Sequence, residues 1–435
     1  MSEMTAEERA IRSKSSYAWV SAGSGFFSQI ICVWGLAIFG ICMTSIAADL
    51  GVEVTDLALA TSLYGALYAG CSFVWGALAD KLGLRATLSL AGVGMGAFLA
   101  VTGQLANSAP MAIACYAVVG VFASGTASAV LPKLISTWFA PNSRGKGMTV
   151  VTLGGSVAGI IAGIIYPMLI MNFGWRGCFT VIGAIAVVIG LLIFLLLRDS
   201  PAKMGTYPFG SPVGTPIEGE DKAEKGDDDK AANRDNLVRV LKMPITWKYG
   251  AIFVFWQFCL MSYQAYTVTA AQAAGLDLAS ASLVTTFVTA GMLVGTIVFP
   301  FASDKVGRKP TIVVASILTA ICAAVAFAVL GAGASAGVVF AVFACYGFSN
   351  AITPLHNTAM AECFPKELRG AGPGVISTIA IIGRFGGPLI AAQIISATGT
   401  AVSVMAFMAV CVLVSGILSA VWLPKTGGKY GDPKA

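Results

Sequence analysis

Apolar stretches long enough to cross a membrane recur along the whole chain. A helix that spans a bilayer needs about 20 consecutive apolar residues, and twelve segments of this kind are present. Six precede a polar gap, at residues 22–48, 57–79, 86–106, 111–138, 147–172 and 176–198. Six follow it, at residues 248–273, 280–301, 311–332, 336–363, 371–395 and 400–423. The pattern predicts an all-α membrane protein with twelve transmembrane helices.

Composition supports this interpretation and excludes a soluble protein. The 435 residues are 57% hydrophobic and only 11% charged, whereas a typical soluble domain is roughly 25% charged. A soluble fold of this length does not have enough interior to hide so much apolar sequence. The excess is therefore expected to face lipid, and the lipid bilayer is the first expected partner.

The placement of lysine and arginine predicts the orientation, because cytoplasmic loops of membrane proteins carry an excess of these residues. One set of connections holds nearly all of them, and the other set holds Arg176 beside acids such as Asp49 and Asp277. The basic set comprises Arg9, Arg12, Lys14, Lys81, Arg85, Arg144, Lys146, Lys305, Arg308, Lys309, Lys366, Arg369, Lys425, Lys429 and Lys434. Both termini are therefore expected in the cytoplasm. The net charge of +6 is a topology signal, and no nucleic-acid partner is expected.

The polar gap predicts the division of the chain into two halves. Four prolines (Pro201, Pro208, Pro212 and Pro216) are followed by a mixed-charge run at residues 218–239, and such low hydrophobicity is typical of a flexible linker. Residues 234–242 are expected to form a short amphipathic helix on the membrane surface. The predicted boundaries are a cytoplasmic N-terminus at 1–21, a six-helix bundle at 22–198, a linker at 199–247, a second six-helix bundle at 248–423 and a cytoplasmic tail at 424–435.

The two halves repeat each other. Asp80 and Gly83 recur as Asp304 and Gly307, between the second and third helices of each half. Phe139, Arg144 and Gly145 recur as Phe364, Arg369 and Gly370, between the fourth and fifth helices. Two bundles related by a tandem repeat can rock about a central site, which is the architecture of a carrier.

The runs Asp80-Lys-Leu-Gly83-Leu-Arg85 and Asp304-Lys-Val-Gly307-Arg308-Lys309 resemble the signature loop of the major facilitator superfamily. The resemblance covers nearly the whole chain and implies the major facilitator fold and transport by alternating access. In that family the loop is a cytoplasmic latch whose ion pairs help to hold the outward-open state. The gate residues carried over are Asp80, Arg85, Asp304 and Arg308, to which Glu362 and Arg369 near the end of the tenth helix are added. The alternative is that these residues only mark topology and cap helix ends. Leu84 stands where a basic residue is more usual.

Four runs bear on the subfamily. Gly174-Trp175-Arg176 and the segment 198–205 are similar to organic-anion, monocarboxylate and oxalate/formate carriers, whereas 362–370 with Gly383-Arg384-Phe385-Gly386 resembles aromatic-acid and sugar carriers. The drug-antiporter signature wants a proline where this chain has Ile160. Drug export is therefore disfavoured.

Arg384 is the most informative single residue. It lies near the middle of the eleventh predicted helix, and no carboxylate is expected at the same depth. Ionisable groups in a span are costly and usually functional, and the planar guanidinium suits a carboxylate. The sequence therefore predicts a carrier of a small organic anion, with the substrate as counter-ion. In the alternative, Arg384 is structural, satisfied by backbone carbonyls and by Asn350 or Tyr346, and the cargo is a neutral solute, sugar or drug.

Further substrate contacts are expected from helices that line the cavity in the resembled family. The polar and aromatic residues expected at this depth, beside Arg384, are Trp34, Tyr64, Tyr68, Ser124, Gln257, Tyr263, Gln264, Tyr346 and Asn350. The only histidine, His356, is a candidate for proton coupling or a packed residue, and Lys133 is expected to extend to the cytoplasmic surface. Protons or a counter-anion are both open as coupling partners.

Other chemistry is poorly represented. The ten cysteines lie in or beside apolar segments without a CxxC pair, so we expect neither disulfides nor a metal site. No cofactor, no catalytic residue and no enzymatic activity are expected, and a transporter-like receptor or membrane enzyme is the remaining alternative class. No cleavable signal is expected at the charged N-terminus. Short loops without disulfides are typical of a bacterial inner membrane, and the protein is expected to be a monomer.

Overall fold

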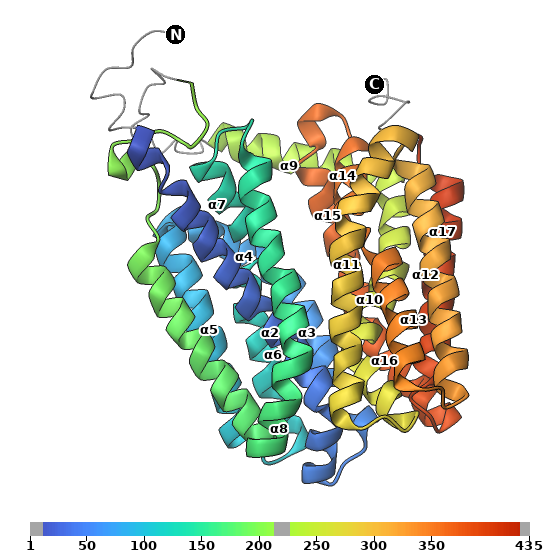
Figure 1. Ribbon diagram of the computed structural model, residues 1–435. Coiled ribbons are helices and arrows are strands. Elements are labelled where there is room, and N and C mark those ends of the chain that lie inside the picture. The colour runs from blue at the N-terminus through green and yellow to red at the C-terminus, as the bar shows by residue number, and fades with distance from the viewer. Residues whose placement is uncertain (1–11, 213–226, 427–435) are drawn as a thin grey trace.

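The computed structural model describes residues 12–212 and 227–426, and this part of the chain is helical apart from one isolated β-bridge between Phe139 and Phe209. Residues 1–11, 213–226 and 427–435 of the predicted termini and linker lie outside the described residues. The helices form two groups that stand side by side, one from each half of the chain (Figure 1). The all-helical membrane fold predicted from the sequence is confirmed.

The helices of the two halves follow the apolar segments. The first half contains α2 (Ala18–Leu50), η1 (Val54–Leu57), α3 (Ala58–Gly70), α4 (Ser72–Leu82), α5 (Leu84–Leu105), α6 (Ala109–Thr126), α7 (Val130–Trp138) and α8 (Arg144–Leu196). The short η2 (Ala202–Met204) and the linker helix α9 (Asp227–Lys242) come next. The second half contains α10 (Pro244–Ala273), α11 (Leu278–Val306), α12 (Arg308–Gly331), α13 (Ala336–Asn350), α14 (Thr353–Glu362), η3 (Lys366–Leu368), α15 (Ala371–Ile379), α16 (Ile381–Thr398) and α17 (Ser403–Trp422).

The length of α8 conceals a sharp reversal. Its 53 residues would reach about 80 Å as a straight helix, far more than the ~30 Å of a bilayer core. Gly174 interrupts it with φ 67° and ψ 175°, which are not helical angles. A residue without a Cβ adopts this conformation readily, so the chain turns back at Gly174 and forms two antiparallel arms.

Several spans are broken, which the hydrophobic pattern did not predict. Segment 111–138 is α6 followed by α7, and segment 336–363 is α13 followed by α14. A proline lies just inside the second piece of each, at Pro132 and Pro354. Proline lacks the N–H of the helical ladder and clashes with the carbonyl four residues earlier, so each helix stops and restarts. Segments 57–79 and 371–395 are likewise divided, at Cys71 and Ala380.

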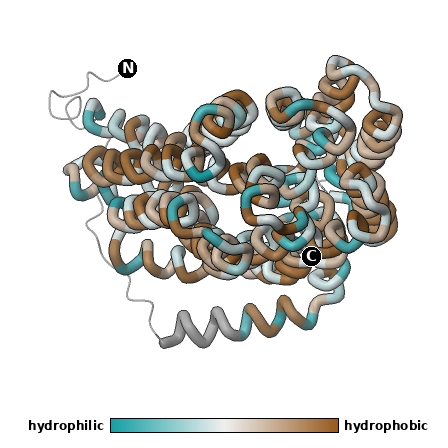
Figure 2. Tube along the Cα trace, turned by 90° about the horizontal axis from the view of Figure 1, so that it is seen from below, coloured by the Kyte–Doolittle hydropathy of each residue, from teal (hydrophilic) through white to brown (hydrophobic). Residues whose placement is uncertain are grey.

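The described helices are suited to a bilayer. Within the described residues, nine helices are long and apolar enough to cross a membrane, and the bent pair formed by residues 54–70 and 72–82 makes a tenth. Large apolar side chains remain exposed on their outer faces, such as Met171 at 74% and Val421 at 67%. Apolar residues dominate most of the helices viewed along the bundle (Figure 2). This surface is compatible with lipid and not with water.

The two halves meet on the side away from α9. At that end α2 crosses α10 so closely that a Cβ on Gly40 would collide with the Gln264 carbonyl. Thr286 of α11 donates to the Ile160 carbonyl of α8 at 3.0 Å. In Figure 1 the halves approach each other toward the lower end and separate toward the end where α9 lies.

Polar loop residues fix helix ends on the closed side. Asp277 precedes α11, and its carboxylate accepts from the N–H groups of Ala279 and Ser280 at 3.2 and 3.5 Å. This is a standard N-cap arrangement that satisfies otherwise unpaired donors. Hydrogen bonding, chiefly to Ser280, lowers the pKa of Asp277, so the carboxylate stays ionised at the positive end of the helix.

Candidate functional site

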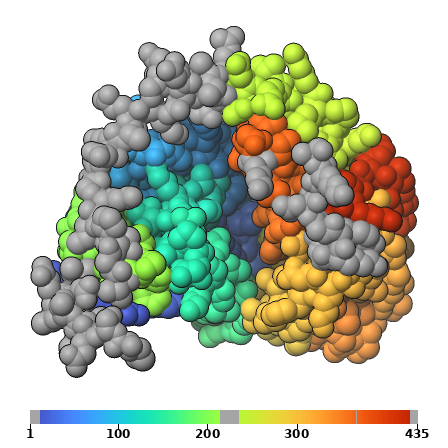
Figure 3. Space-filling model, turned by 90° about the horizontal axis from the view of Figure 1, so that it is seen from above, coloured from blue at the N-terminus to red at the C-terminus, as the bar shows by residue number. Residues whose placement is uncertain are grey.

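A cavity of about 1110 Å³ separates the two halves on the α9 side. Its walls come from α3, α4 and α7 of the first half and from α10, α15 and α16 of the second, and Leu237 of α9 contributes at the mouth. Viewed from the α9 side, the surface is hollowed between the two halves (Figure 3). A site built from both halves is the arrangement that alternating access requires.

Arg384 lies at the inner end of this cavity, on the first turn of α16. With the Gln257 amide turned so that its oxygen faces the guanidinium, that oxygen accepts from Nε at 2.6 Å and from Nη2 at 2.7 Å. The guanidinium carbon lies 5.6 Å from the centroid of the Tyr68 ring. Among the described residues, no carboxylate lies within 4.0 Å of Arg384. Its charge is therefore neutralised by no acid of the described chain.

Glycines in α16 allow Arg384 and Gln257 to lie this close together. A Cβ on Gly383 would lie 2.8 Å from the Gln257 Cβ, and a Cβ on Gly387 would lie 2.9 Å from the Phe258 carbonyl oxygen. Both distances are shorter than real contacts, so α16 packs against α10 at a separation that only glycine permits. Gly65 of α3 leaves similar room on the other side, where a Cβ would contact the Arg384 Cβ at 3.4 Å.

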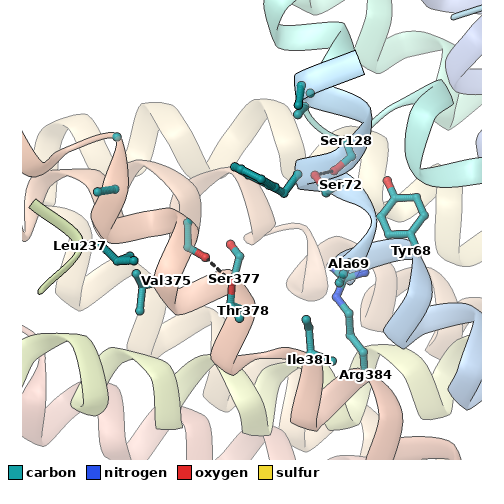
Figure 4. A pocket seen from close by; sticks show the side chains of 18 of the residues that line it. Tyr68, Ala69, Ser72, Ser128, Leu237, Val375, Ser377, Thr378, Ile381 and Arg384 are labelled. Atoms are coloured by element: carbon teal, nitrogen blue, oxygen red, sulfur yellow. Dashed lines mark hydrogen bonds between the residues drawn. The ribbon is translucent and has the colours of Figure 1, made fainter. Parts of the chain in front are cut away.

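Hydroxyl groups line the wall between Arg384 and the mouth, and sequence reasoning missed them. Ser72 and Ser128, from the breaks α3–α4 and α6–α7, hydrogen-bond to each other. Ser377 and Thr378 of α15 are exposed to the cavity, and Thr378 donates to the Gly374 carbonyl at 3.0 Å. Figure 4 shows the two pairs on walls from opposite halves, with Tyr68 and Arg384 farther to the right. Ser72 and Ser128 could have been identified as serines beside breaks in the helices, but the sequence analysis did not predict the breaks.

Lys133 also lines the cavity, where it forms an ion pair with Asp80. The two side chains come from α7 and α4 of the same half, and are 33% and 64% exposed. The sequence placed Asp80 at a gate and Lys133 at the surface. The structure brings both to the wall of the cavity.

Of the ten predicted substrate contacts, the cavity brings together Arg384, Gln257 and Tyr68. The other seven lie outside its lining: Trp34, Tyr64, Ser124, Tyr263, Gln264, Tyr346 and Asn350. Trp34 donates to the Ala158 carbonyl at 3.0 Å, and the Tyr346 hydroxyl lies 3.4 Å from the Cys259 Sγ. These two side chains serve helix packing in this conformation. The structural alternative named Asn350 or Tyr346 as partners of Arg384, whereas the amide that contacts it is Gln257.

The predicted gate residues pair within each half. Arg308 bonds Asp304 at 2.7 Å and Glu362 at 3.1 Å, all in the second half. In the first half, Arg85 donates from Nε to the Phe194 carbonyl, and its guanidinium lies 4.2 Å from the Phe194 ring centroid. Arg369 donates to the Phe364 carbonyl at 3.4 Å. Arg308 and Arg85 thus bond residues of their own half, consistent with a mouth that is open.

His356 is fully buried on the first turn of α14, outside the cavity lining. The Tyr249 hydroxyl lies 3.2 Å from its Nδ1, and no partner was found for Nε2 among the described residues. The rings of Phe253 and Trp256 lie 5.7 and 5.2 Å away, measured between centroids. Phe253 itself lines the cavity, so one aromatic ring separates His356 from the site.

The Major Facilitator Superfamily model matches residues 25–283 and 258–435 of the chain. The chain is 24% identical to the membrane sensor protein UhpC of Escherichia coli K12, over 79% of this chain and 78% of that protein. It is 26% identical to the sialic acid transporter NanX of the same strain, over 85% of this chain and 87% of that protein. It is 25% identical to a hexuronate transporter of Bacillus subtilis, over 40% of this chain and 41% of that protein.

Solved structures agree on the fold. A D-xylose–proton symporter aligns with a TM-score of 0.74 at 16% identity, over 95% of this chain and 99% of that one. A second solved structure is a bacterial homologue of the human lysosomal transporter Spinster in an inward-facing and occupied conformation. It aligns with a TM-score of 0.66 at 15% identity, over 92% of this chain and 93% of that one. The chain therefore belongs to the Major Facilitator Superfamily and is a multi-pass membrane transport protein, not an enzyme.

Proposed function

We propose that the protein is a carrier that moves a small organic anion across the membrane by alternating access. The observation that carries the proposal is Arg384, a cation at the inner end of the cavity without an acid within 4.0 Å among the described residues. A charge in this position is costly unless it is compensated. An anionic substrate supplies the compensation, and the face of the guanidinium that Gln257 does not occupy remains for its carboxylate.

The names of the relatives support an anion as cargo. Sialic acid and hexuronates, named for two of the matched transporters, are carboxylic acids. Several further matches are named as probable hexose phosphate transport proteins, and phosphate esters are also anions. All of these cargoes are negatively charged, and a negative charge is what the Arg384 guanidinium would bind.

We further propose twelve spans with both termini in the cytoplasm. The ten spans counted by length and hydropathy become twelve when α8 is divided at Gly174 and α10, with 30 residues, is included. Lysine and arginine gather in the connections on the α9 side, so this side is assigned to the cytoplasm. The cavity then faces inward. The bacterial relatives favour an inner membrane.

In this proposal the signature-loop residues form the cytoplasmic gate. Asp80 and Arg85 belong to the first half, and Asp304, Arg308, Glu362 and Arg369 to the second. Closing the mouth would exchange pairs within a half for pairs across the halves, as two-state interfaces do. The seven predicted contacts outside the present lining are assigned to states in which the helices have moved.

Coupling and assembly are part of the proposal. Exchange against a counter-anion needs no titratable group in the protein, whereas proton coupling through a side chain would use His356, whose ordinary pKa lies near neutrality. The cavity is complete within one chain, which supports a monomer as the working unit.

A second candidate function is sensing. Two matches, from Escherichia coli and Salmonella typhimurium, are named membrane sensor protein UhpC. A sensor would bind an anion at Arg384 without transporting it. A third candidate, in which Arg384 is structural and the cargo is neutral, predicts uptake that survives neutralisation of Arg384.

The test is uptake of labelled carboxylates and neutral sugars into proteoliposomes, together with equilibrium binding. Arg384→Gln removes the charge, and Arg198→Gln removes a charge outside the cavity as a matched control. We expect anion uptake to be lost in Arg384→Gln and kept in the control, with both variants monodisperse. Anion binding without flux would favour a sensor. Uptake that survives Arg384→Gln would overturn the anion proposal.

A further inference from the structure

The charges on the cavity wall add up to one positive charge. Three charged side chains line the cavity within the described residues: Asp80, Lys133 and Arg384. Asp80 and Lys133 form an ion pair and cancel each other. The other lining elements, α9, α10 and α15, contribute no charged side chain to the wall. One negative charge therefore neutralises the site, and a second would be left without a partner.

The wall between the charges is built to meet hydroxyl groups. Ser72 and Ser128 contribute two hydroxyls from the first half, and Ser377 and Thr378 contribute two from the second (Figure 4). Ser72 and Ser128 share one hydrogen bond, so one of their two protons stays available to a ligand. Thr378 donates to its own helix and keeps its oxygen as an acceptor. Serine and threonine hydroxyls both donate and accept, which matches the bonding of an alcohol.

The size of the cavity separates ligand classes. Its volume of about 1110 Å³ lies at the upper end of the roughly 300–1,000 Å³ usual for small-molecule sites. A two- or three-carbon acid bound at Arg384 would leave the hydroxyl walls without partners. A molecule with the length of a sugar ring can reach Arg384 with its anionic end and both walls with its hydroxyls.

We propose that the cavity binds a hydroxylated monoanion of sugar-acid size, and that Asp80 excludes dianions by neutralising Lys133. The inference rests on the proposed function and deepens it. The carboxylate takes the free face of Arg384, and the hydroxyls join the two halves through Ser72 and Ser128 on one side and Ser377 and Thr378 on the other. Asp80 is then a specificity-determining residue in addition to its place in the gate.

Glucose 6-phosphate tests valence with one molecule, because a phosphate ester loses its second proton near pH 6. It is mainly a monoanion at pH 5 and a dianion at pH 8, whereas glucuronate stays a monoanion at both. We would measure equilibrium binding to the full chain in lipid nanodiscs, with glucose as the neutral control. Relative to glucuronate, glucose 6-phosphate should bind roughly fivefold more tightly at pH 5 than at pH 8. A ratio of glucose 6-phosphate to glucuronate affinity that is the same at pH 5 and pH 8 would overturn the inference.

Asp80→Asn tests the origin of the exclusion. It leaves Lys133 unpaired and gives the cavity two positive charges, so the preference for glucuronate over glucose 6-phosphate at pH 8 should fall roughly fivefold. The matched control is Asp304→Asn, which removes the corresponding acid of the second half, outside the cavity lining. The control should keep the parent preference. An unchanged preference in a folded Asp80→Asn protein would remove Asp80 from the proposal.

The hydroxyl walls are tested with Thr378→Val, which replaces the hydroxyl with a methyl group of similar size, and with Ser377→Ala, which removes the hydroxyl. Both variants should weaken the binding of glucuronate severalfold. The binding of benzoate, a monoanion without hydroxyls, should not change. If benzoate or lactate binds through Arg384 and glucuronate does not, the inference fails and the proposed function stands. If no anion binds in an Arg384-dependent way, both fail. The pH experiment on the parent chain decides the valence question even where a variant does not fold.

Discussion

Thr44 Oγ1 of α2 donates to Gln272 Oε1 of α10 at 2.9 Å, and this hydrogen bond joins the two halves of the molecule. It lies near the ends of both helices that are remote from α9, beside the close approach of Gly40 and the Gln264 carbonyl. The halves are therefore tied on one side of the membrane while the cavity is open on the other. Breaking the tie must favour any conformation in which that side opens.

Thr44→Val removes the hydroxyl and keeps the shape of the side chain. A hydrogen bond of this kind contributes about 1 kcal/mol, so the ratio of outward- to inward-open molecules should rise roughly fivefold. Double electron–electron resonance between labels at Leu82 and Val306, both exposed at the α9-side ends of α4 and α11, measures the closing of the mouth. Labels attached through a non-natural amino acid leave the native cysteines alone. Thr44→Ser keeps the donor and should match the parent, and identical distances in all three proteins would refute a role for this bond.

Gly40→Ala probes the same interface by steric means. The added methyl would collide with the Gln264 carbonyl, and overpacking of this kind costs about 1–3 kcal/mol. The closed side should be forced apart, with a lower melting temperature and a larger fraction of closed mouths than in Thr44→Val. Gly23→Ala is the matched control on the same helix, since nothing lies within 4 Å of its added methyl. Equal melting temperatures for the two alanine variants would contradict the packing described.

The spans and the repeat were predictable because they depend on local composition. Segment 86–106 corresponds to α5 and segment 311–332 to α12, each within three residues. The gap between segments 147–172 and 176–198 marks the reversal at Gly174, where the backbone adopts a conformation that residues with a Cβ rarely take. Hydropathy measures whether a side chain is more stable in lipid or in water. Most of this chain must be compatible with lipid, so hydropathy is enough to locate the spans.

The site was predicted only in part, because its members come from elements that are distant in sequence. Arg384 was identified by its cost in a membrane, and Gln257 and Tyr68 by their expected depth. The hydroxyls of Ser72, Ser128 and Ser377 were not, since serine in an apolar segment gives no sign of which neighbour it faces. Their positions depend on helix breaks, and proline effects such as that of Pro132 act on structure that hydropathy does not describe.

Gln257→Glu should abolish anion binding without unfolding the protein. The amide oxygen of Gln257 lies 2.6–2.7 Å from two guanidinium nitrogens of Arg384, so a carboxylate there would form an ion pair and take the place of the substrate. Gln257→Met, which has similar length and no charge, should weaken binding far less. Binding of labelled carboxylate to purified protein measures the difference. Parent-like affinity in Gln257→Glu would show that the anion does not use Arg384.

Glu362→Gln should destabilise the protein more than Asp304→Asn does. Both acids bond Arg308, but Glu362 is 15% exposed and Asp304 is 63% exposed. An exposed ion pair contributes about 0–1 kcal/mol, whereas a charge-assisted bond in a half-buried pair contributes about 1.5–3 kcal/mol. Thermal denaturation in detergent orders the two variants. The reverse order would mean that Asp304 is the principal partner of Arg308.

His356→Gln separates proton coupling from packing. Gln keeps a polar group toward Tyr249, whose hydroxyl lies 3.2 Å from Nδ1, but it cannot be protonated near neutral pH. If the proton passes through His356, uptake driven by an imposed pH gradient should be lost, because no other histidine exists in the chain. Exchange of labelled for unlabelled anion needs no net proton movement and should continue at the parent rate. His356→Phe, which fills the aromatic surroundings without a polar group, should behave like Gln in driven uptake. Driven uptake equal to that of the parent in both variants would assign His356 to packing and leave anion exchange as the mode of transport.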